Sequence, residues 1–361
     1  MTRICLVAGG TGGHIFPAVS FGEWIVSRRE DVTISYVCGS RPLEREIYAS
    51  RGIEPFLLPL SGSPFGVKGL LPRAKRWKQT LAALFSFRRY MRESGTDCCV
   101  LFGGYVSFVP LLVSRMGRIP AVIHEQNCAA GKVTRLASRL GLPVASGWSS
   151  CDPLVKDQFT VTGIPIRPLR RKNPREAWKN MIKDAPFPEK KIIGILGGSL
   201  MSRRLIQLLS CIIGEKEFDQ ILFLTLGEDE EEMFASIPRE RRSSFLPAGK
   251  QWDMTDFYSL LSGAVTRGGA STLYELMAGG IPSVVIPWKE AADNHQEKNA
   301  RCFAERTGGE VWKEDDSPGL LQGKILSILR KKDACGERFS EGDESEALWG
   351  LISSSIGREI N

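Results

Sequence analysis

The chain of 361 residues is 42% hydrophobic and 25% charged, with a formal net charge of +7. Its length predicts two domains, and its composition is that of a folded globular chain rather than a disordered or fibrous one. No apolar run is long enough to cross a membrane and no export signal opens the sequence, so we expect neither a transmembrane helix nor secretion. The nine scattered cysteines predict reduced thiols in the cytoplasm and no metal site.

Strand-like and helix-like segments alternate along the first half of the chain. Strands are expected at 3–8, 33–38, 55–58, 98–102, 121–124 and 158–162. Helices are expected at 16–28, 43–51, 73–92, 107–116 and 131–140. This alternation predicts a parallel sheet with helices on both faces.

A second alternating series follows a proline-bearing stretch, 163–174, which we interpret as the connection between two domains. Its strands are expected at 192–196, 221–226, 264–266 and 283–286, and its helices at 202–213, 271–278, 294–306 and 320–330. A terminal helix is expected at 344–356. The sequence therefore predicts domains at 1–163 and 164–341, with a C-terminal helix in 342–361 that packs back on the first domain.

Four Gly-Gly turns follow expected strands, at Gly9-Gly10, Gly103-Gly104, Gly197-Gly198 and Gly268-Gly269. Open parallel sheets bind ligands at the carboxyl ends of their strands, so we expect all four turns around one cleft. Glycine lets the backbone approach a ligand closely, and the start of a following helix presents unpaired N–H groups to an anion. The first turn also carries His14, which can move protons near pH 7; a solvent-facing histidine on a tight βα turn is the alternative.

Polar residues also follow the strand at 121–124. We interpret Glu125 and Gln126 as parts of a hydrogen-bonded loop, and Asn127 as a contact for a sugar hydroxyl or acetamido group. In the helix start after Gly268-Gly269, free N–H groups could hold a phosphate and Glu275 could accept ribose hydroxyls. The alternative for Glu275 is an interaction with the dipole of its own helix.

The segment 73–90 carries six basic residues and no acidic one, interleaved with aromatic and aliphatic residues. This mixture predicts a surface for anionic lipid or nucleic acid. The alternative is a helix with Leu81, Leu84 and Phe85 in the core and a solvated basic face.

Several motifs together resemble one enzyme family: GGTGGHIFPA, FGGYVS, IHEQN, GIPIR, LGGS, RGGASTLYELMAGGIPSVVIP and DNHQEKNA. In order and spacing they are similar to the bacterial peripheral-membrane N-acetylglucosaminyltransferases that convert lipid I to lipid II. The resemblance spans nearly the whole chain. It implies the GT-B architecture, in which two Rossmann-like doubly wound domains face each other across a cleft. The N-terminal domain would face the acceptor and the membrane, and the C-terminal domain would bind UDP-N-acetylglucosamine.

The resemblance also implies the reaction. The 4-hydroxyl of N-acetylmuramic acid in undecaprenyl-linked lipid I would attack the anomeric carbon of the donor sugar and displace UDP with inversion. No cofactor, no metal at the donor pyrophosphate and no nucleic acid are expected. The cytoplasmic face of the cell membrane is the expected location, with roles in peptidoglycan synthesis, cell shape and division, and with other cell-wall synthesis proteins as partners. The alternatives are a diacylglycerol glycosyltransferase, a UDP-N-acetylglucosamine 2-epimerase or a non-catalytic nucleotide-sugar-binding protein.

By position, the resemblance implies His14 as general base, with Glu125 as its rival. The donor-binding residues it implies are Thr11, Gly12, Gly13, Asn127, Arg167, Ser199, Gln251, Ala270, Ser271, Thr272, Glu275, His295 and Gln296. On the acceptor side it implies Gly104 and Tyr105, and for membrane docking Arg73, Lys75, Arg76, Trp77, Lys78 and Phe85. The turn at 199–203 departs from the family pattern, because a later glycine of that pattern is absent; weaker donor binding and a slightly different acceptor are the two alternatives.

Overall fold

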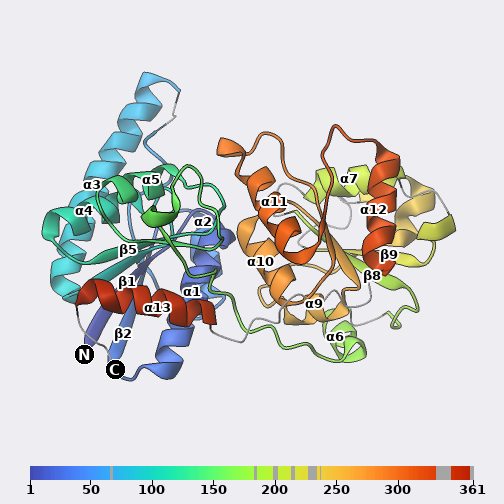
Figure 1. The fold of residues 1–361 in the computed structure, drawn as a ribbon, viewed down its shortest axis with the longest axis horizontal. Helices are drawn as coiled ribbons and strands as arrows, with labels where there is room; N and C mark the ends of the chain where they lie inside the picture. Colours follow the sequence, from blue (N-terminus) through green and yellow to red (C-terminus); the bar gives the residue numbers. More distant parts are fainter. Residues whose placement is uncertain are drawn as a thin grey trace. The chain divides into compact units, whose positions relative to one another are not determined.

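The computed structural model describes residues 1–65, 68–182, 185–197, 202–212, 216–226, 234–235, 237–330 and 343–357. The chain divides into two compact units (Figure 1). Unit 1 comprises Met1–Arg167 together with Ser340–Asn361, and unit 2 comprises Pro168–Phe339. Each unit is built around its own parallel sheet.

The sheet of unit 1 has seven parallel strands in the order β3-β2-β1-β4-β5-β6-β7. Their bounds are β1 Thr2–Val7, β2 Val32–Cys38, β3 Phe56–Leu57, β4 Cys98–Leu101, β5 Ala121–Glu125, β6 Val144–Ser146 and β7 Thr160–Val161. Strand β4 is apolar along its whole length, and β1 is apolar after Arg3, because helices cover both faces of the sheet. Chain order reverses beside β1: the connection after β1 leads to β2 on one side, and the connection after β4 leads to β5 on the other side.

The helices of unit 1 are α1 Gly12–Arg28, α2 Pro42–Ala49, α3 Leu70–Ser94, α4 Phe108–Gly117, α5 Lys132–Arg139 and α13 Asp343–Ile356, with a short 3-10 helix, η1 Lys156–Gln158. One face of the sheet packs on α3, α4 and α5 through residues such as Phe87, Val109 and Ala137. On α1, Phe21 stacks on Trp24, and Trp24 lies 6.4 Å from Trp349 of α13 between ring centroids. An ion pair between Arg29 and Glu346 also links α13 to the rest of unit 1.

Unit 2 has six parallel strands in the order β10-β9-β8-β11-β12-β13. Their bounds are β8 Lys191–Leu196, β9 Ile221–Thr225, β10 Phe245–Pro247, β11 Gly263–Thr266, β12 Ser283–Val285 and β13 Glu310–Val311. Its helices are α6 Pro174–Met181, α7 Ser202–Ile212, α9 Thr255–Leu260, α10 Ala270–Ala278, α11 His295–Thr307 and α12 Pro318–Arg330, with 3-10 turns η2 Lys216–Phe218, η3 Arg239–Ser244 and η4 Ala292–Asn294. Phe223 and Val265 belong to a core that α7 and α12 cover.

Two differences from the sequence-based expectations bear on the site. Helix α1 begins at Gly12 rather than at residue 16, so that the glycines and His14 form its first turn. Helix α6 begins at Pro174, where the connection was expected to end, because Asn173 caps it by accepting a hydrogen bond from the Arg175 N–H.

Candidate functional site

The first glycine turn of unit 1 leads from β1 into α1. Gly10 has a φ of +94°, and its N–H donates to Oε1 of Glu44 at 2.7 Å. A Cβ on Gly9 would lie only 2.6 Å from Cγ2 of Val106, so no side chain fits there. The turn therefore requires glycine for two separate reasons, conformation and close packing.

Glu44, on α2, is a residue that the sequence analysis missed. Its side chain is fully buried, and Oε1 also accepts the Tyr105 hydroxyl at 2.6 Å. Burial and this carboxylate raise the pKa of Tyr105 far above its usual range, so the phenol stays protonated and donates. The guanidinium of Arg41 lies 4.5 Å from the centroid of the Tyr105 ring. Glu44 thus joins the first glycine turn to the expected acceptor-side residue.

His14 lies between two of the four Gly-Gly turns. Its half-buried ring packs on Gly103 and Gly104, which have φ values of +77° and +72°. A Cβ on Gly104 would lie 3.3 Å from Cδ2 of His14 and 3.1 Å from the Gly9 carbonyl oxygen. The turns after β1 and β4 therefore meet at the histidine, and the second turn leaves space for its ring.

Behind His14 lies a buried row of polar side chains. Nδ1 of His14 is 2.7 Å from Oε1 of Gln126, and Nε2 of Gln126 is 3.0 Å from Nδ1 of His124. Nε2 of His124 is 2.8 Å from the carbonyl oxygen of Gly163. His124 is wholly buried in β5 and stacks on Phe102. Burial lowers the pKa of His124 to about 4, so this histidine is neutral at physiological pH.

Glu125 is held by four hydrogen bonds. Its carboxylate accepts from the N–H and the side-chain amide of Asn127, at 3.1 and 2.9 Å, and from the Gly131 N–H at 2.9 Å. It also accepts from the Thr134 hydroxyl at 2.5 Å. The side chain is buried, and its hydrogen bonds hold the loop after β5 in place. This agrees with the interpretation of Glu125 as part of a hydrogen-bonded loop.

The remaining predicted residues of unit 1 surround the start of α1. Thr11 and Gly13 are exposed, and Gly12 is half-buried. The guanidinium carbon of Arg167 lies 4.5 Å from the centroid of the Phe16 ring, and the side chain is nearly buried. A cation over an aromatic face is held in orientation as well as in place. Arg167 is therefore fixed one turn of helix beyond the glycines.

In unit 2 the corresponding turn leads from β11 into α10. Oε1 of Gln296 accepts the N–H groups of Gly268 at 3.1 Å and of Trp288 at 3.0 Å. The buried amide of Asn299 donates to the Gly268 carbonyl at 2.9 Å. A Cβ on Gly268 would lie 2.3 Å from the Gln296 carbonyl oxygen, so the turn has no room for a side chain. Gln296 therefore holds two loops together through the same oxygen.

Helix α10 begins directly after this turn, and no side chain caps it. Its first three residues present their N–H groups at the helix start: Ala270, Ser271 and Thr272. One turn further on, buried Glu275 accepts the Tyr258 hydroxyl at 2.7 Å on Oε2. Tyr258, like Glu44, is a partner that no local sequence signal revealed.

Three further predicted residues of unit 2 differ in how they are held. Nδ1 of His295 is 2.8 Å from the Ala292 carbonyl oxygen, and the side chain is half-buried. Nε2 of Gln251 donates to the Ala248 carbonyl at 3.1 Å. Ser199 lies outside the described residues, as do Leu200 and Met201 of the altered turn at 199–203.

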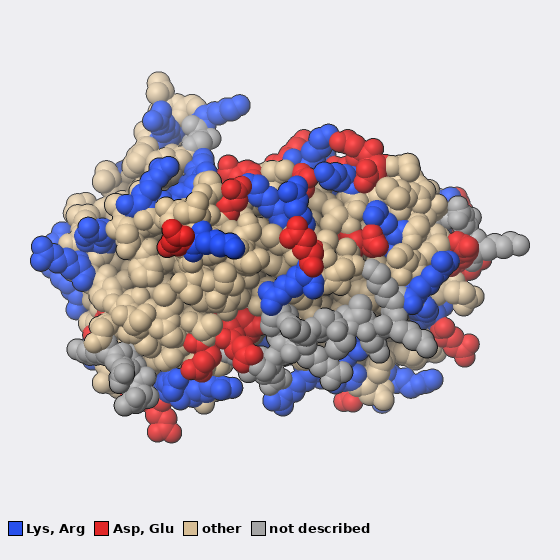
Figure 2. Space-filling view, viewed as in Figure 1, with Lys and Arg blue, Asp and Glu red and all other residues tan. Residues whose placement is uncertain are grey.

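Helix α3 carries the segment expected to meet a membrane. Its first turns stand clear of the sheet of unit 1 (Figure 1), and Figure 2 shows basic side chains along it. Leu81 and Phe85 are 57% and 70% exposed, so the alternative is wrong for these two residues, whereas Leu84 packs against the core as it states. Ala83 and Phe87 form the buried face instead. Arg76 is only half-exposed because it binds Ser61 and Gln79.

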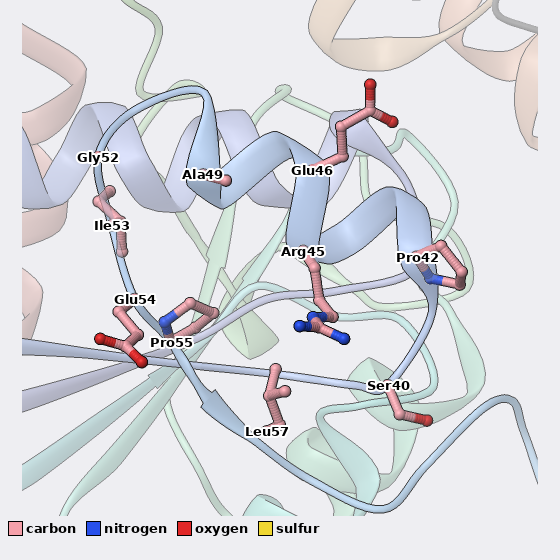
Figure 3. A pocket seen from close by; sticks show the side chains of 10 residues that line it. All are labelled: Ser40, Pro42, Arg45, Glu46, Ala49, Gly52, Ile53, Glu54, Pro55 and Leu57. Carbon is pink, nitrogen blue, oxygen red and sulfur yellow. The ribbon is translucent and has the colours of Figure 1, made fainter.

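One pocket lies away from all the predicted site residues. It is a cavity of about 630 Å³ in unit 1, between α2 and β3 (Figure 3). Arg45, Glu46 and Glu54 line it together with small and apolar residues. Within the described residues, no group of three or more His, Cys, Asp or Glu side chains is placed to hold a metal ion. No helix in the same ranges has the length and hydropathy needed to cross a bilayer.

Comparison with known proteins identifies the family. Residues 4–145 match the glycosyltransferase family 28 N-terminal domain, and residues 192–347 match the glycosyltransferase family 28 C-terminal domain. A Thermodesulfovibrio yellowstonii protein is 30% identical over 344 residues, covering 93% of this chain and 92% of its own length. An Ectopseudomonas mendocina protein is 32% identical over 304 residues, covering 84% of this chain and 82% of its own. Both are named UDP-N-acetylglucosamine--N-acetylmuramyl-(pentapeptide) pyrophosphoryl-undecaprenol N-acetylglucosamine transferase.

Solved structures share the fold. MurG of Acinetobacter baumannii superposes with a TM-score of 0.70 at 23% identity, covering 98% of this chain and 100% of its own. A putative UDP-N-acetylglucosamine 2-epimerase of Listeria monocytogenes gives 0.66 at 11% identity, covering 98% and 96%. At such identities the likeness concerns architecture, and it agrees with the GT-B fold class predicted from the motifs. With both its domains matched, the chain belongs to glycosyltransferase family 28, in the family of bacterial N-acetylglucosamine transferases that the two relatives represent.

Proposed function

We propose that this protein transfers N-acetylglucosamine from UDP-N-acetylglucosamine to the 4-hydroxyl of N-acetylmuramic acid in lipid I, giving lipid II for peptidoglycan. The observation that carries the proposal is the near full-length match, at 30% identity, to a transferase named for this donor and acceptor. The oxygen of the acceptor hydroxyl forms a bond to the anomeric carbon, and the bond from that carbon to the UDP oxygen breaks. UDP leaves with the bonding electrons, and the hydroxyl proton passes to a base.

We assign that base to His14. Its ring is half-buried and packed between two glycine turns, and within the described chain its Nε2 has no hydrogen-bond partner. Glu125, the rival, already accepts four hydrogen bonds in a buried loop. Proton transfer to Glu125 would break part of that network, so we give it a role in holding the loop. Asn127, which it holds, the exposed Thr11 and Gly13, and the half-buried Gly12 are proposed contacts for the donor sugar.

We assign the nucleotide to unit 2. The uncapped start of α10 supplies N–H groups and a partial positive charge, which suit a phosphate without a metal ion. Glu275 lies one turn along the same helix and suits the ribose hydroxyls. Gln251, His295 and Gln296 are proposed contacts for the uracil and the sugar. Arg167, held against Phe16, is proposed to neutralise the pyrophosphate, with Ser199 as a further contact.

We further propose that α3 docks on the cytoplasmic face of the membrane. Leu70 and Leu71, in its first turn, are each 86% exposed. Insertion into lipid would remove this apolar surface from water. Exposed Arg73, Lys75 and Lys78 follow, and each basic residue near an anionic surface contributes about 1 kcal/mol. Trp77 and Phe85 add aromatic surface, whereas Arg76 is committed to Ser61 and Gln79. Other cell-wall synthesis proteins are expected partners at the same membrane.

A single-turnover assay with UDP-N-acetylglucosamine and a lipid I analogue tests the reaction. The expected result is one UDP released for each disaccharide formed. Donor binding without UDP release would indicate a non-catalytic binding protein. Conversion of the donor sugar without any acceptor would indicate an epimerase.

Vesicle flotation tests the docking. Binding to phosphatidylglycerol vesicles, and weaker binding to phosphatidylcholine vesicles, is expected for the native chain. Leu70→Ser with Leu71→Ser should reduce the bound fraction, and Lys75→Glu with Lys78→Glu should reduce it further. Val26→Ser, which changes an exposed apolar residue of α1, is the matched control. Unchanged binding of both double variants would rule out α3 as the docking surface.

A further inference from the structure

The direction of the hydrogen bonds behind His14 is fixed by two main-chain carbonyls. The Gly163 carbonyl, 2.8 Å from Nε2 of His124, can only accept. His124 must therefore carry its proton on Nε2. A neutral imidazole has a single N–H, so Nδ1 of His124 can only accept.

The amide of Gln126 is oriented by the same logic. Its Nε2 faces Nδ1 of His124 at 3.0 Å and the His124 carbonyl oxygen at 3.1 Å. Both of these atoms accept, so both hydrogens of the amide nitrogen are used. The reversed amide would place oxygen against oxygen at the His124 carbonyl. Oε1 of Gln126 must therefore face Nδ1 of His14, at 2.7 Å.

An amide oxygen cannot donate, so Nδ1 of His14 carries the proton and Nε2 carries the lone pair. We infer that Gln126 and His124 are positioning residues that fix the tautomer of His14, leaving Nε2 as the nitrogen that accepts a proton. The inference rests on the proposed role of His14 as the base. Nε2 is also the atom near Gly104, where a Cβ would lie 3.5 Å away.

The row keeps its direction when His14 gains a proton, because Gln126 Oε1 can accept from the imidazolium as well. Reversal would require a proton on Nδ1 of His124. Burial lowers the pKa of His124 to about 4; nearby Glu125 acts against this shift and His14 reinforces it. A charged His14 therefore makes protonation of His124 still less favourable. Neither positioning residue has to move or ionise during the reaction.

Nitrogen NMR tests the tautomer directly, because the chain contains only three histidines. Long-range proton–nitrogen spectra of the full chain distinguish the two neutral tautomers of each ring, and His14→Ala identifies the signals of His14. When both rings are neutral, protons are expected on Nδ1 of His14 and on Nε2 of His124. A proton on Nε2 of His14 would overturn the inference, whether or not the protein transfers sugar.

Steady-state kinetics can distinguish a positioning role of Gln126 from a purely structural role. Gln126→Leu should lower kcat at least about tenfold and leave KM for the donor within about twofold, because the base spends less time in the competent tautomer. Gln126→Glu keeps an acceptor for Nδ1 of His14 and adds a negative charge. It should retain more activity than the leucine variant and move the acidic limb of the kcat/KM profile up by about one pH unit.

Gln322→Leu on α12 is the matched control, since Gln322 donates to the Ile212 carbonyl outside both proposed sites. Normal kcat and an unchanged His14 tautomer in Gln126→Leu would overturn the inference. If that variant does not fold, the spectra of the native chain still decide. If the native chain transfers no sugar, the proposed function fails, while the tautomer remains measurable.

Discussion

The two units use the same architectural position, a glycine turn between a central strand and a helix, in chemically different ways. In unit 1 the N–H of Gly10 is bound by the carboxylate of Glu44, whereas in unit 2 the N–H of Gly268 is bound by the neutral amide oxygen of Gln296. A buried carboxylate beneath a turn repels an anion, and a neutral amide does not. The first turn is thus better suited to hold a proton-accepting histidine, and the second to lie beside a phosphate.

A tyrosine–glutamate hydrogen bond accompanies each turn. Tyr105 donates to Glu44, which lies on a different helix from the turn, and Tyr258 donates to Glu275, on the helix that the turn begins. In unit 1 the pair braces the glycine backbone. In unit 2 the pair places a carboxylate one turn beyond a helix start. The same two residue types therefore serve packing in unit 1 and, in the proposed function, ligand recognition in unit 2.

Removing the proposed base should produce the largest kinetic difference between the two units. His14→Ala is expected to lower kcat by about 1,000-fold, the middle of the range for a general base, with KM for the donor nearly unchanged. His295→Ala in unit 2 should instead raise the donor KM with a smaller change in kcat. Steady-state kinetics on both variants test the contrast. Equal effects on kcat would erase it.

Acid should destabilise unit 1 through His124. The pKa of this histidine is lowered from 6.5 to about 4 in the folded protein. Between these values the unfolded chain binds more protons, so the free energy of unfolding falls as the pH drops from 6.5 towards 4, by about 3 kcal/mol at the lower end. Urea titrations at pH 7 and pH 4.5, read by hydrogen exchange, can follow each unit. His124→Asn should remove this component, and an unchanged pH dependence in that variant would contradict the assignment.

Glu275→Ala should weaken donor binding by about 10- to 100-fold, because a charged acceptor for hydroxyl groups is lost. Calorimetric titration with UDP measures the change. Glu290→Ala, at an exposed glutamate of the same unit, is the control. Normal affinity in Glu275→Ala would remove the ribose assignment and leave Glu275 as a partner of Tyr258 alone.

The smallest expected effects come from the two hydroxyls. Tyr105→Phe and Tyr258→Phe should each lower stability by about 1 to 2 kcal/mol, because each removes a hydrogen bond to a carboxylate. Only Tyr258→Phe should also raise KM for the donor, by about threefold, since Glu275 loses its orienting partner. Thermal unfolding and kinetics together check this. A donor defect in Tyr105→Phe would show that the first turn contacts the nucleotide after all.

Local patterns predicted the long elements and the location of the polar motifs. Strand β1 is apolar after Arg3 and β5 begins with three apolar residues, whereas α10 and α11 follow turn and cap residues. Strand β13 has two residues and β10 has three, too few to produce a period. Helix α6 was missed although Asn173 and Pro174 form a cap signal.

Only part of the candidate site could be predicted from the sequence, because some of its contacts are local and others join residues far apart in the chain. His14 and Glu275 stand in recognisable motifs, because turn chemistry is local. Glu44 acts on Gly10 from 34 residues away, and Tyr258 on Glu275 from 17, so both contacts arise only when the sheets form. Gln126 was interpreted as part of a loop. It contacts His14, 112 residues away in the sequence, and the direction of its amide depends on the His124 carbonyl, which no sequence pattern indicates.

Because α13 belongs to unit 1, unit 2 is an insertion within the sequence of unit 1, and the chain passes between the units twice. Trp349 meets Trp24, and Glu346 meets Arg29, only after nearly the whole chain has been made. During synthesis, then, the first unit to start folding is the last to finish. A chain released early would leave the surface around Trp24 uncovered, while the inserted unit 2 has all its described strands and helices in place.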